Sequence, residues 1–251
     1  MENLEYNNLR KEVGFLKKRE FLLQYAPVIA VGALIVTLGI IYRQPFYKML
    51  PMLNTLVIML LSANANRYSF LFGGLNSVVY GIVYLSEHVY FSAISAMLVS
   101  FPLQMFSFFH WRKREQGKRS PLKMLGVRGR LSVLGIGILA YGAAYFLLLP
   151  FFSNAAFPAV DILVFVLGVV VTVLIALCYV EGQYLNVLSC LCNLVLWLMI
   201  ALRDPSNLNY LVIGAYNLFR VLQGCVVWTR KYRAEQTEMR ERGAVAQGIL
   251  L

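Results

Sequence analysis

The stretch PAVDILVFVLGVVVTVLIALCYV, residues 158–180, is almost entirely apolar and carries one charged residue, Asp161, near its beginning. A helix needs about 20 consecutive apolar residues to cross the hydrocarbon core of a bilayer. This stretch is therefore long enough to span a membrane by itself. We expect it to be one of several such helices, because the chain on both sides repeats the same pattern.

Further apolar segments precede and follow it, each bounded by polar or charged residues. Together they predict an all-α integral membrane protein with about eight transmembrane helices. The eight predicted spans are residues 21–42, 49–63, 69–86, 89–111, 130–152, 158–180, 182–202 and 208–228. The second span has the weakest signal, because asparagine and serine residues dilute it.

The composition leads to the same class of protein. Hydrophobic residues make up 59% of the chain and charged residues 14%, whereas soluble domains carry roughly 25% charged residues. The net charge is +11, and a strongly positive charge is also typical of nucleic-acid-binding proteins. Here the charges lie in the tails and in one loop, as charges that flank membrane helices do. We therefore expect anionic lipid headgroups of a bilayer as the partner, and no nucleic acid.

The basic residues predict an orientation. They gather before the first span, after the fourth and after the eighth, and eight spans place these three groups on one side of the membrane. The other side receives only Arg43, Lys48 and Arg203. Because cytoplasmic loops carry the excess of Lys and Arg, both termini are predicted to be cytoplasmic.

The sequence also contains a candidate internal repeat. Four pairs of polar or aromatic landmarks are each separated by 117 residues. The pairs are Asn76 with Asn193, Tyr80 with Trp197, Glu87 with Asp204, and Trp111 with Trp228. Chance agreement between hydrophobic helices is the alternative interpretation.

If the repeat is real, it defines the domain organisation. Two three-helix units, 49–111 and 158–228, are joined by residues 112–157, which hold a basic cytoplasmic loop and a linker helix. The shift between the units is an even number of spans, so the units are parallel, as in sugar transporters of the SWEET type. Outside the repeat lie a cytoplasmic segment (1–20), an extra N-terminal transmembrane helix (21–48) and a cytoplasmic tail (229–251).

Polar side chains inside these spans are the candidate functional residues, because they are costly in hydrocarbon and usually face an interior cavity. Asn193 and Trp197 are four residues apart and share a helix face. An amide donates and accepts hydrogen bonds and an indole stacks on flat rings, so the pair suits a neutral heteroaromatic ligand. Asn76 and Tyr80 form the equivalent pair. The alternative for each asparagine is a structural bond to a neighbouring helix.

The last span is the most polar one. Tyr216, Arg220 and Gln223 follow one helix face, with Asn217 beside them, and Gln104 in the fourth span is a weaker candidate. Arg220 either lines the pathway or extends its side chain toward the interface. Pro102 lies inside the fourth span and must disturb its helix.

Several kinds of chemistry lack a signature in the sequence. There is no nucleotide-binding Walker loop, and the two histidines, His88 and His110, have neither metal-ligand nor catalytic spacing. The acids near the spans all lie at span ends, so an obvious proton relay is missing. We therefore expect no metal, no cofactor and no enzyme activity, and we favour passive transport over coupled transport.

Four stretches resemble the PnuC-type vitamin transporters, which are best known for nicotinamide riboside. They are NSVVYGIVY (76–84), FPLQMFSFFHWRKR (101–114), CNLVLWLMIAL (192–202) and GAYNLFRVLQGCVVWTRK (214–231). The resemblance implies a SWEET-like 3+1+3 architecture and a homotrimer in a bacterial inner membrane. It also implies facilitated diffusion of a vitamin precursor that is trapped by phosphorylation in the cytosol.

The resemblance places Asn193 where the family's substrate-contacting asparagine sits. The family pattern usually has a tryptophan one turn earlier, where this chain has Ser189, and Trp197 is a candidate to replace its stacking role. Related members are thought to carry thiamine, riboflavin or deoxynucleosides, and a sugar is a further alternative. Two other hypotheses stay open: a membrane enzyme acting on lipids and a scaffold that transports nothing.

Overall fold

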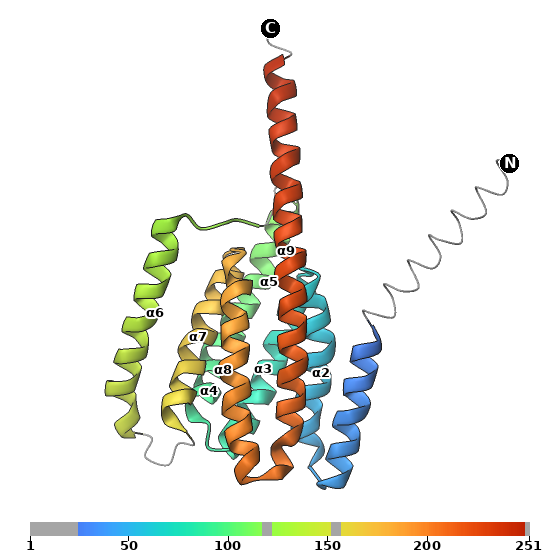
Figure 1. Ribbon diagram of the computed structural model, residues 1–251, viewed down its shortest axis with the longest axis vertical. Coiled ribbons are helices and arrows are strands. Elements are labelled where there is room, and N and C mark those ends of the chain that lie inside the picture. Colours follow the sequence, from blue (N-terminus) through green and yellow to red (C-terminus); the bar gives the residue numbers. More distant parts are fainter. Residues whose placement is uncertain (1–24, 117–121, 152–156, 249–251) are drawn as a thin grey trace, which may run out of the picture.

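The computed structural model describes residues 25–116, 122–151 and 157–248, and these are almost entirely helical (Figure 1). A helix pairs its own backbone N–H and C=O groups, and this is required in a bilayer because hydrocarbon offers them no hydrogen-bond partner. Seven described helices are long and apolar enough to cross a membrane, and a shorter apolar helix, Tyr25–Ile41, precedes them. The predicted all-α membrane fold is therefore confirmed. The predicted N-terminal segment 1–20 lies outside the described residues, as does part of the basic loop.

The helices follow the predicted spans closely. They are α2 (Phe46–Ala63), α3 (Tyr68–Ser86), α4 (Tyr90–Ile94), the π-helical turn η1 (Ser95–Ser100), α5 (Phe101–Gln116), α6 (Val127–Leu148), the short η2 (Leu149–Phe151), α7 (Pro158–Ala176), α8 (Glu181–Arg203), the short η3 (Pro205–Asn207) and α9 (Leu208–Gly248). Helix α9 continues past residue 228, the predicted end of its membrane span, and projects beyond the bundle (Figure 1).

The fourth span consists of α4, η1 and α5 in one run, Tyr90–Arg112. Pro102 is the second residue after the π-helical turn. Proline has no N–H, and its ring clashes with the carbonyl four residues earlier. A wider π turn relieves this clash, so the predicted disturbance takes the form of a local widening.

The helices form two groups of three, α2 with α3 and α4–α5, and α7 with α8 and α9. The groups meet through α2 against α9 and through α5 against α7. Helix Tyr25–Ile41 packs on α2, where Ile35 is buried among α2 side chains. Helix α6 packs chiefly on α7 and stands at the edge of the bundle (Figure 1).

Figure 1 shows that helix Tyr25–Ile41 begins, α5 ends, α6 begins and α9 projects at the same end of the bundle. We call this the basic end, because Arg112, Arg128, Arg130, Arg230 and Arg233 lie there. The connections from α3 to α4 and from α8 to α9 lie at the opposite end.

A pair of tryptophans fills the interior at the basic end. The rings of Trp111 and Trp228 lie 5.5 Å apart between centroids, and both residues are 1% exposed. Trp111 Nε1 donates to the carbonyl of Ile175 at 3.3 Å, and Trp228 Nε1 donates to the carbonyl of Ser62 at 3.2 Å. The last helix of each group is thus tied to the first helix of the other.

A polar network lies at the opposite end. Lys48 forms an ion pair with Glu87. The Asn207 amide donates to Glu87 Oε2 at 3.1 Å and to Asp204 Oδ2 at 3.2 Å. Both acids of one predicted repeat pair therefore bind the same side chain.

Candidate binding site

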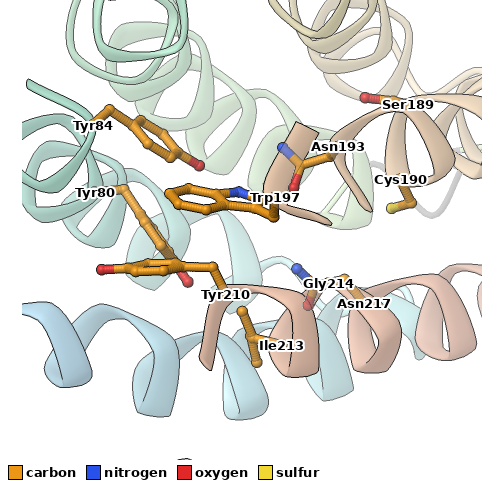
Figure 2. Close-up of a pocket in the computed structure, with 10 residues that line it drawn as sticks. All are labelled: Tyr80, Tyr84, Ser189, Cys190, Asn193, Trp197, Tyr210, Ile213, Gly214 and Asn217. Carbon is orange, nitrogen blue, oxygen red and sulfur yellow. The ribbon is translucent and has the colours of Figure 1, made fainter. Parts of the chain in front are cut away.

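A cavity of about 170 Å³ lies between α3, α8 and α9 (Figure 2). Its lining is aromatic and polar and contains no charged side chain. The lining residues are Tyr80, Tyr84, Ser189, Cys190, Asn193, Trp197, Tyr210, Ile213, Gly214 and Asn217. We call it the first cavity.

An aromatic stack forms one wall of the first cavity. Trp197 lies between Tyr84 and Tyr210 (Figure 2). Its ring is 4.1 Å from that of Tyr210, at 17°, and 6.0 Å from that of Tyr84, at 29°. Tyr80 continues the stack at 5.6 Å from Tyr84. One face of the indole is tightly covered, while the gap toward Tyr84 is wider.

Two amide side chains face the space beside this stack (Figure 2). The side chain of Asn193, in the middle of α8, makes no hydrogen bond to any described residue. Asn217 Oδ1 is a buried atom that likewise has no partner among the described residues. A buried polar group left unpaired costs about 1–3 kcal/mol. Both amides therefore have hydrogen-bonding capacity that a ligand in the cavity would use.

Two further cavities adjoin the first, and the third of the series reaches the basic end. A second, of about 200 Å³, shares Tyr80, Tyr84, Ser189 and Asn193 with the first. A third, of about 280 Å³, shares Ser77, Tyr80 and Gly168 with the second.

The third cavity ends at the tryptophan pair. Its lining includes Ser62 and Ile175, whose carbonyls accept the two indole hydrogen bonds. No charged side chain lines any of the three cavities. Together they form a neutral interior series between the polar network and the tryptophan pair.

Asn76 is a predicted site residue whose amide already has hydrogen-bond partners within the protein. It lines the third cavity, but its Nδ2 donates to the Pro51 carbonyl at 2.9 Å and to Thr55 Oγ1 at 3.1 Å. Its Oδ1 accepts from Asn54 Nδ2 at 3.3 Å. Asn76 therefore joins α3 to α2, as the structural alternative proposed. Gln104 also lines the third cavity.

Tyr216, Arg220 and Gln223 line none of the three cavities. Tyr216 donates its hydroxyl proton to the Leu56 carbonyl at 2.8 Å and accepts from Arg220 Nε at 3.0 Å. Arg220 also donates to Gln223 Oε1 at 2.7 Å and is fully buried. The guanidinium thus binds two side chains of its own helix, and one of them, Tyr216, is bonded to α2. It neither reaches the interface nor faces the interior series.

Sequence reasoning missed Tyr84 and Tyr210. Tyr84 had a usable signal, because it lies one helical turn after Tyr80 on the same face of α3. Tyr210 had none, because its stacking on Trp197 depends on how α8 packs against α9. Gly214 permits this approach: a Cβ there would lie 2.9 Å from Leu194 Cδ2.

Asp161 is fully buried, yet it binds the chain and not the cavity series. It accepts from the backbone N–H groups of Phe91 at 3.1 Å and Ser92 at 3.2 Å, and from Ser92 Oγ at 2.5 Å. It therefore caps the start of α4 from α7. Within the part of the chain that the structure describes, no group of three or more metal-ligating side chains occurs.

Comparisons with known proteins show the fold and the family of this chain. The structure described as "Crystal structure of the Vitamin B3 transporter PnuC" matches with a TM-score of 0.73 and 18% identity, covering 85% of this chain and 93% of that one. This likeness shows a shared fold. No curated protein matches the chain. The sequence model described as "Nicotinamide mononucleotide transporter" matches residues 45–230, which is most of the chain, so this protein belongs to the nicotinamide mononucleotide transporter family.

Proposed function

We propose that this transporter carries a phosphate-free, nicotinamide riboside-like nucleoside across the bacterial inner membrane by facilitated diffusion. The observation that carries the proposal is the first cavity, where two amides with unused hydrogen-bonding capacity lie beside a stacked tryptophan. The substrate passes unchanged, so the proposal involves no catalytic step and no cofactor.

The neutral lining favours a riboside over a mononucleotide. A phosphate buried in a protein requires Arg, Lys or the N-terminus of a helix. The three cavities offer no Lys or Arg, and the guanidinium of Arg220 is bound to Tyr216 and Gln223. A phosphate there would lose its hydration without gaining a partner.

The aromatic and amide groups suit the rest of such a molecule. A pyridinium ring carries positive charge, which is attracted to the faces of Trp and Tyr. We place this ring in the first cavity, against the aromatic wall that Trp197 and Tyr84 form. The carboxamide then reaches Asn193 and Asn217, and Ser189 serves a ribose hydroxyl.

We also propose that two parallel repeats, SWEET-like in arrangement, move against each other around this site. Two contacts support the repeat. Trp111 and Trp228 contact each other at one end, and Glu87 and Asp204 share Asn207 at the other. Residues close to a two-fold axis are expected to meet their own equivalents in this way. We place the basic end and both termini in the cytoplasm, and a homotrimer remains part of the proposal.

The decisive experiment is ligand-induced thermal stabilisation of the purified full chain. Nicotinamide riboside, nicotinamide mononucleotide, thiamine, riboflavin and a simple sugar are compared, because a ligand that binds only the folded state raises apparent stability. We expect the riboside alone to stabilise the protein. Asn193→Ala should abolish the shift, and Cys192→Ala should retain it, since Cys192 lines none of the three cavities.

Other outcomes would redirect the proposal. Equal stabilisation by the mononucleotide would refute the argument from the neutral lining. Stabilisation by thiamine, riboflavin or the sugar would keep a transporter but change its substrate. No stabilisation by any of them, in protein that unfolds cooperatively, would favour a scaffold.

A further inference from the structure

A groove of about 610 Å³ lies between α6 and the α7–α8 pair. None of its lining residues lines the three cavities of the interior series. Leucine, valine and isoleucine side chains form most of its surface, while Arg130 and Glu181 lie at the basic end. We call it the α6 groove.

The groove exists because α6 meets α7 closely only toward the opposite end of the bundle. There Ala144 packs with Ile162 and Val166. Nearer the basic end the helices separate, and a Cβ added at Gly137, which lines the groove, would meet no atom within 4 Å. Because α6 is a predicted span, this open space faces hydrocarbon, where an acyl chain is the natural filling.

The length of the groove matches one leaflet of a bilayer. Arg130 and Tyr141 lie near its two ends on α6, about 16 Å apart along the helix axis. Half the hydrocarbon thickness of a bilayer is about 15 Å. A lipid with its headgroup at Arg130 would therefore end its acyl chain near the middle of the membrane, where α6 closes on α7.

The charged end of the groove holds one positive and one negative group. Arg130 donates from Nε and from a terminal nitrogen to Glu181 Oε1 at 3.2 and 3.0 Å, and its side chain is 53% exposed. Leu125 N donates to the same oxygen at 3.0 Å. Glu181 Oε2 is buried and has no partner among the described residues. The site thus offers an exposed guanidinium beside an unpaired carboxylate oxygen.

We propose that the α6 groove binds one phosphatidylethanolamine molecule of the leaflet at the basic end. Its phosphate accepts from Arg130, and its ammonium donates to Glu181 Oε2. A zwitterionic headgroup matches an Arg–Glu pair in both charges. Phosphatidylcholine has no N–H to donate, and phosphatidylglycerol has no cation, so each satisfies only part of the site.

The segment before α6 keeps this site in place. Lys123 N donates to the Cys178 carbonyl at 2.8 Å, and Val180 N donates to the Lys123 carbonyl at 3.0 Å. The Lys123 ammonium lies 5.3 Å from the centre of the Tyr179 ring. The chain entering α6 is thus fixed to the turn between α7 and α8. The lipid would fill the α6 groove next to this fixed segment.

Native mass spectrometry of the full chain in detergent tests the proposal. Phosphatidylethanolamine, phosphatidylcholine and phosphatidylglycerol with identical acyl chains are added separately. We expect one phosphatidylethanolamine per chain, bound about tenfold more tightly than either other lipid, because a hydrogen bond to a charged group is lost otherwise. Glu181→Gln should remove this preference.

A second pair of variants tests the groove without touching the charged pair. Gly137→Leu places a side chain in the groove and should abolish lipid retention. Gly135→Leu, on the same helix but outside the groove lining, should retain it. Equal binding of all three lipids, or retention in Gly137→Leu, would overturn the proposal. Absence of bound lipid in every oligomeric state of the chain, the trimer included, would also overturn it. None of these outcomes depends on which solute the interior series carries.

Discussion

At the scale of single residues, Asn76 and Asn193, which are 117 positions apart, have different hydrogen-bonding roles. Thr55 and Thr172, also 117 apart, each donate to the carbonyl four residues earlier at 2.7 Å. In the first unit the Asn76 amide also reaches that carbonyl, which belongs to Pro51. In the second unit Asn193 faces the first cavity instead (Figure 2). The spacing predicted both positions, but the helix packing decided which amide stays available.

This difference predicts opposite effects of the same substitution. Asn76→Ala removes partners from the Pro51 carbonyl, Thr55 and Asn54, so we expect it to lower the free energy of unfolding by about 1–3 kcal/mol. Asn193→Ala breaks no bond to a described residue and should change stability little, within about 0.5 kcal/mol. It should weaken ligand binding about tenfold or more, because a buried ligand amide loses its partner.

Thermal unfolding of both variants in detergent, with and without ligand, separates the two effects. A large loss of stability in Asn193→Ala without ligand would mean that this asparagine is structural. Normal ligand stabilisation of that variant would remove it from the binding site.

At the scale of helices, the sequence predicted existence and approximate bounds well, because about 20 apolar residues leave few alternatives. It did not predict the π-helical turn before Pro102 or the position of α6 at the edge of the bundle. Each of these depends on contacts between helices. The start of α4 is the clearest case, since its cap comes from Asp161, about 70 positions later in the chain.

The two capping acids near the opposite end should therefore differ in their contribution to stability. Asp161 is buried and accepts three hydrogen bonds, so Asp161→Ala should cost about 2–3 kcal/mol. Asp204 is exposed and caps the short η3 through Ser206. Asp204→Ala should cost about 1 kcal/mol or less.

Acid titration gives a further check on Asp204. Hydrogen bonds from Ser206 hold the pKa of Asp204 below its ordinary value. The contribution of Asp204 to stability is therefore complete at neutral pH and is lost only as the pH falls through that lowered pKa.

Equal destabilisation by the Asp161 and Asp204 substitutions at pH 7 would contradict the assignment of Asp161 as the cap of a transmembrane helix.

At the scale of the whole molecule, the interior series is closed by different chemistry at its two ends. The basic end is closed by apolar packing of Trp111 against Trp228. The opposite end is closed by the Lys48–Glu87 pair and the Asn207 amide. The sequence identified the tryptophans and the acids as repeat landmarks. It gave no sign that each pair converges on one point, because convergence follows from the arrangement of the two groups of helices.

The polar end should be the easier one to open by a single substitution. Glu87→Gln keeps the size of the side chain but removes the charge that binds Lys48, and an isosteric change leaves the packing intact. Cys190 lines the first cavity and reports on access to it. In a chain whose other cysteines are replaced by alanine, we expect Glu87→Gln to raise the rate of Cys190 modification about tenfold, equivalent to about 1.4 kcal/mol. The reagent is a membrane-impermeant maleimide added on the side of the polar network.

Arg203→Gln is the matched control for this experiment. Arg203 lies at the same end, but its guanidinium packs over the Phe157 ring at 4.0 Å and belongs to no part of the network. It should leave the rate unchanged. Trp111→Ala should raise the rate only for reagent added at the basic end. If Glu87→Gln speeds modification from the basic end, or from neither side, the polar network is not a gate and the closure must lie in the aromatic stack around Trp197.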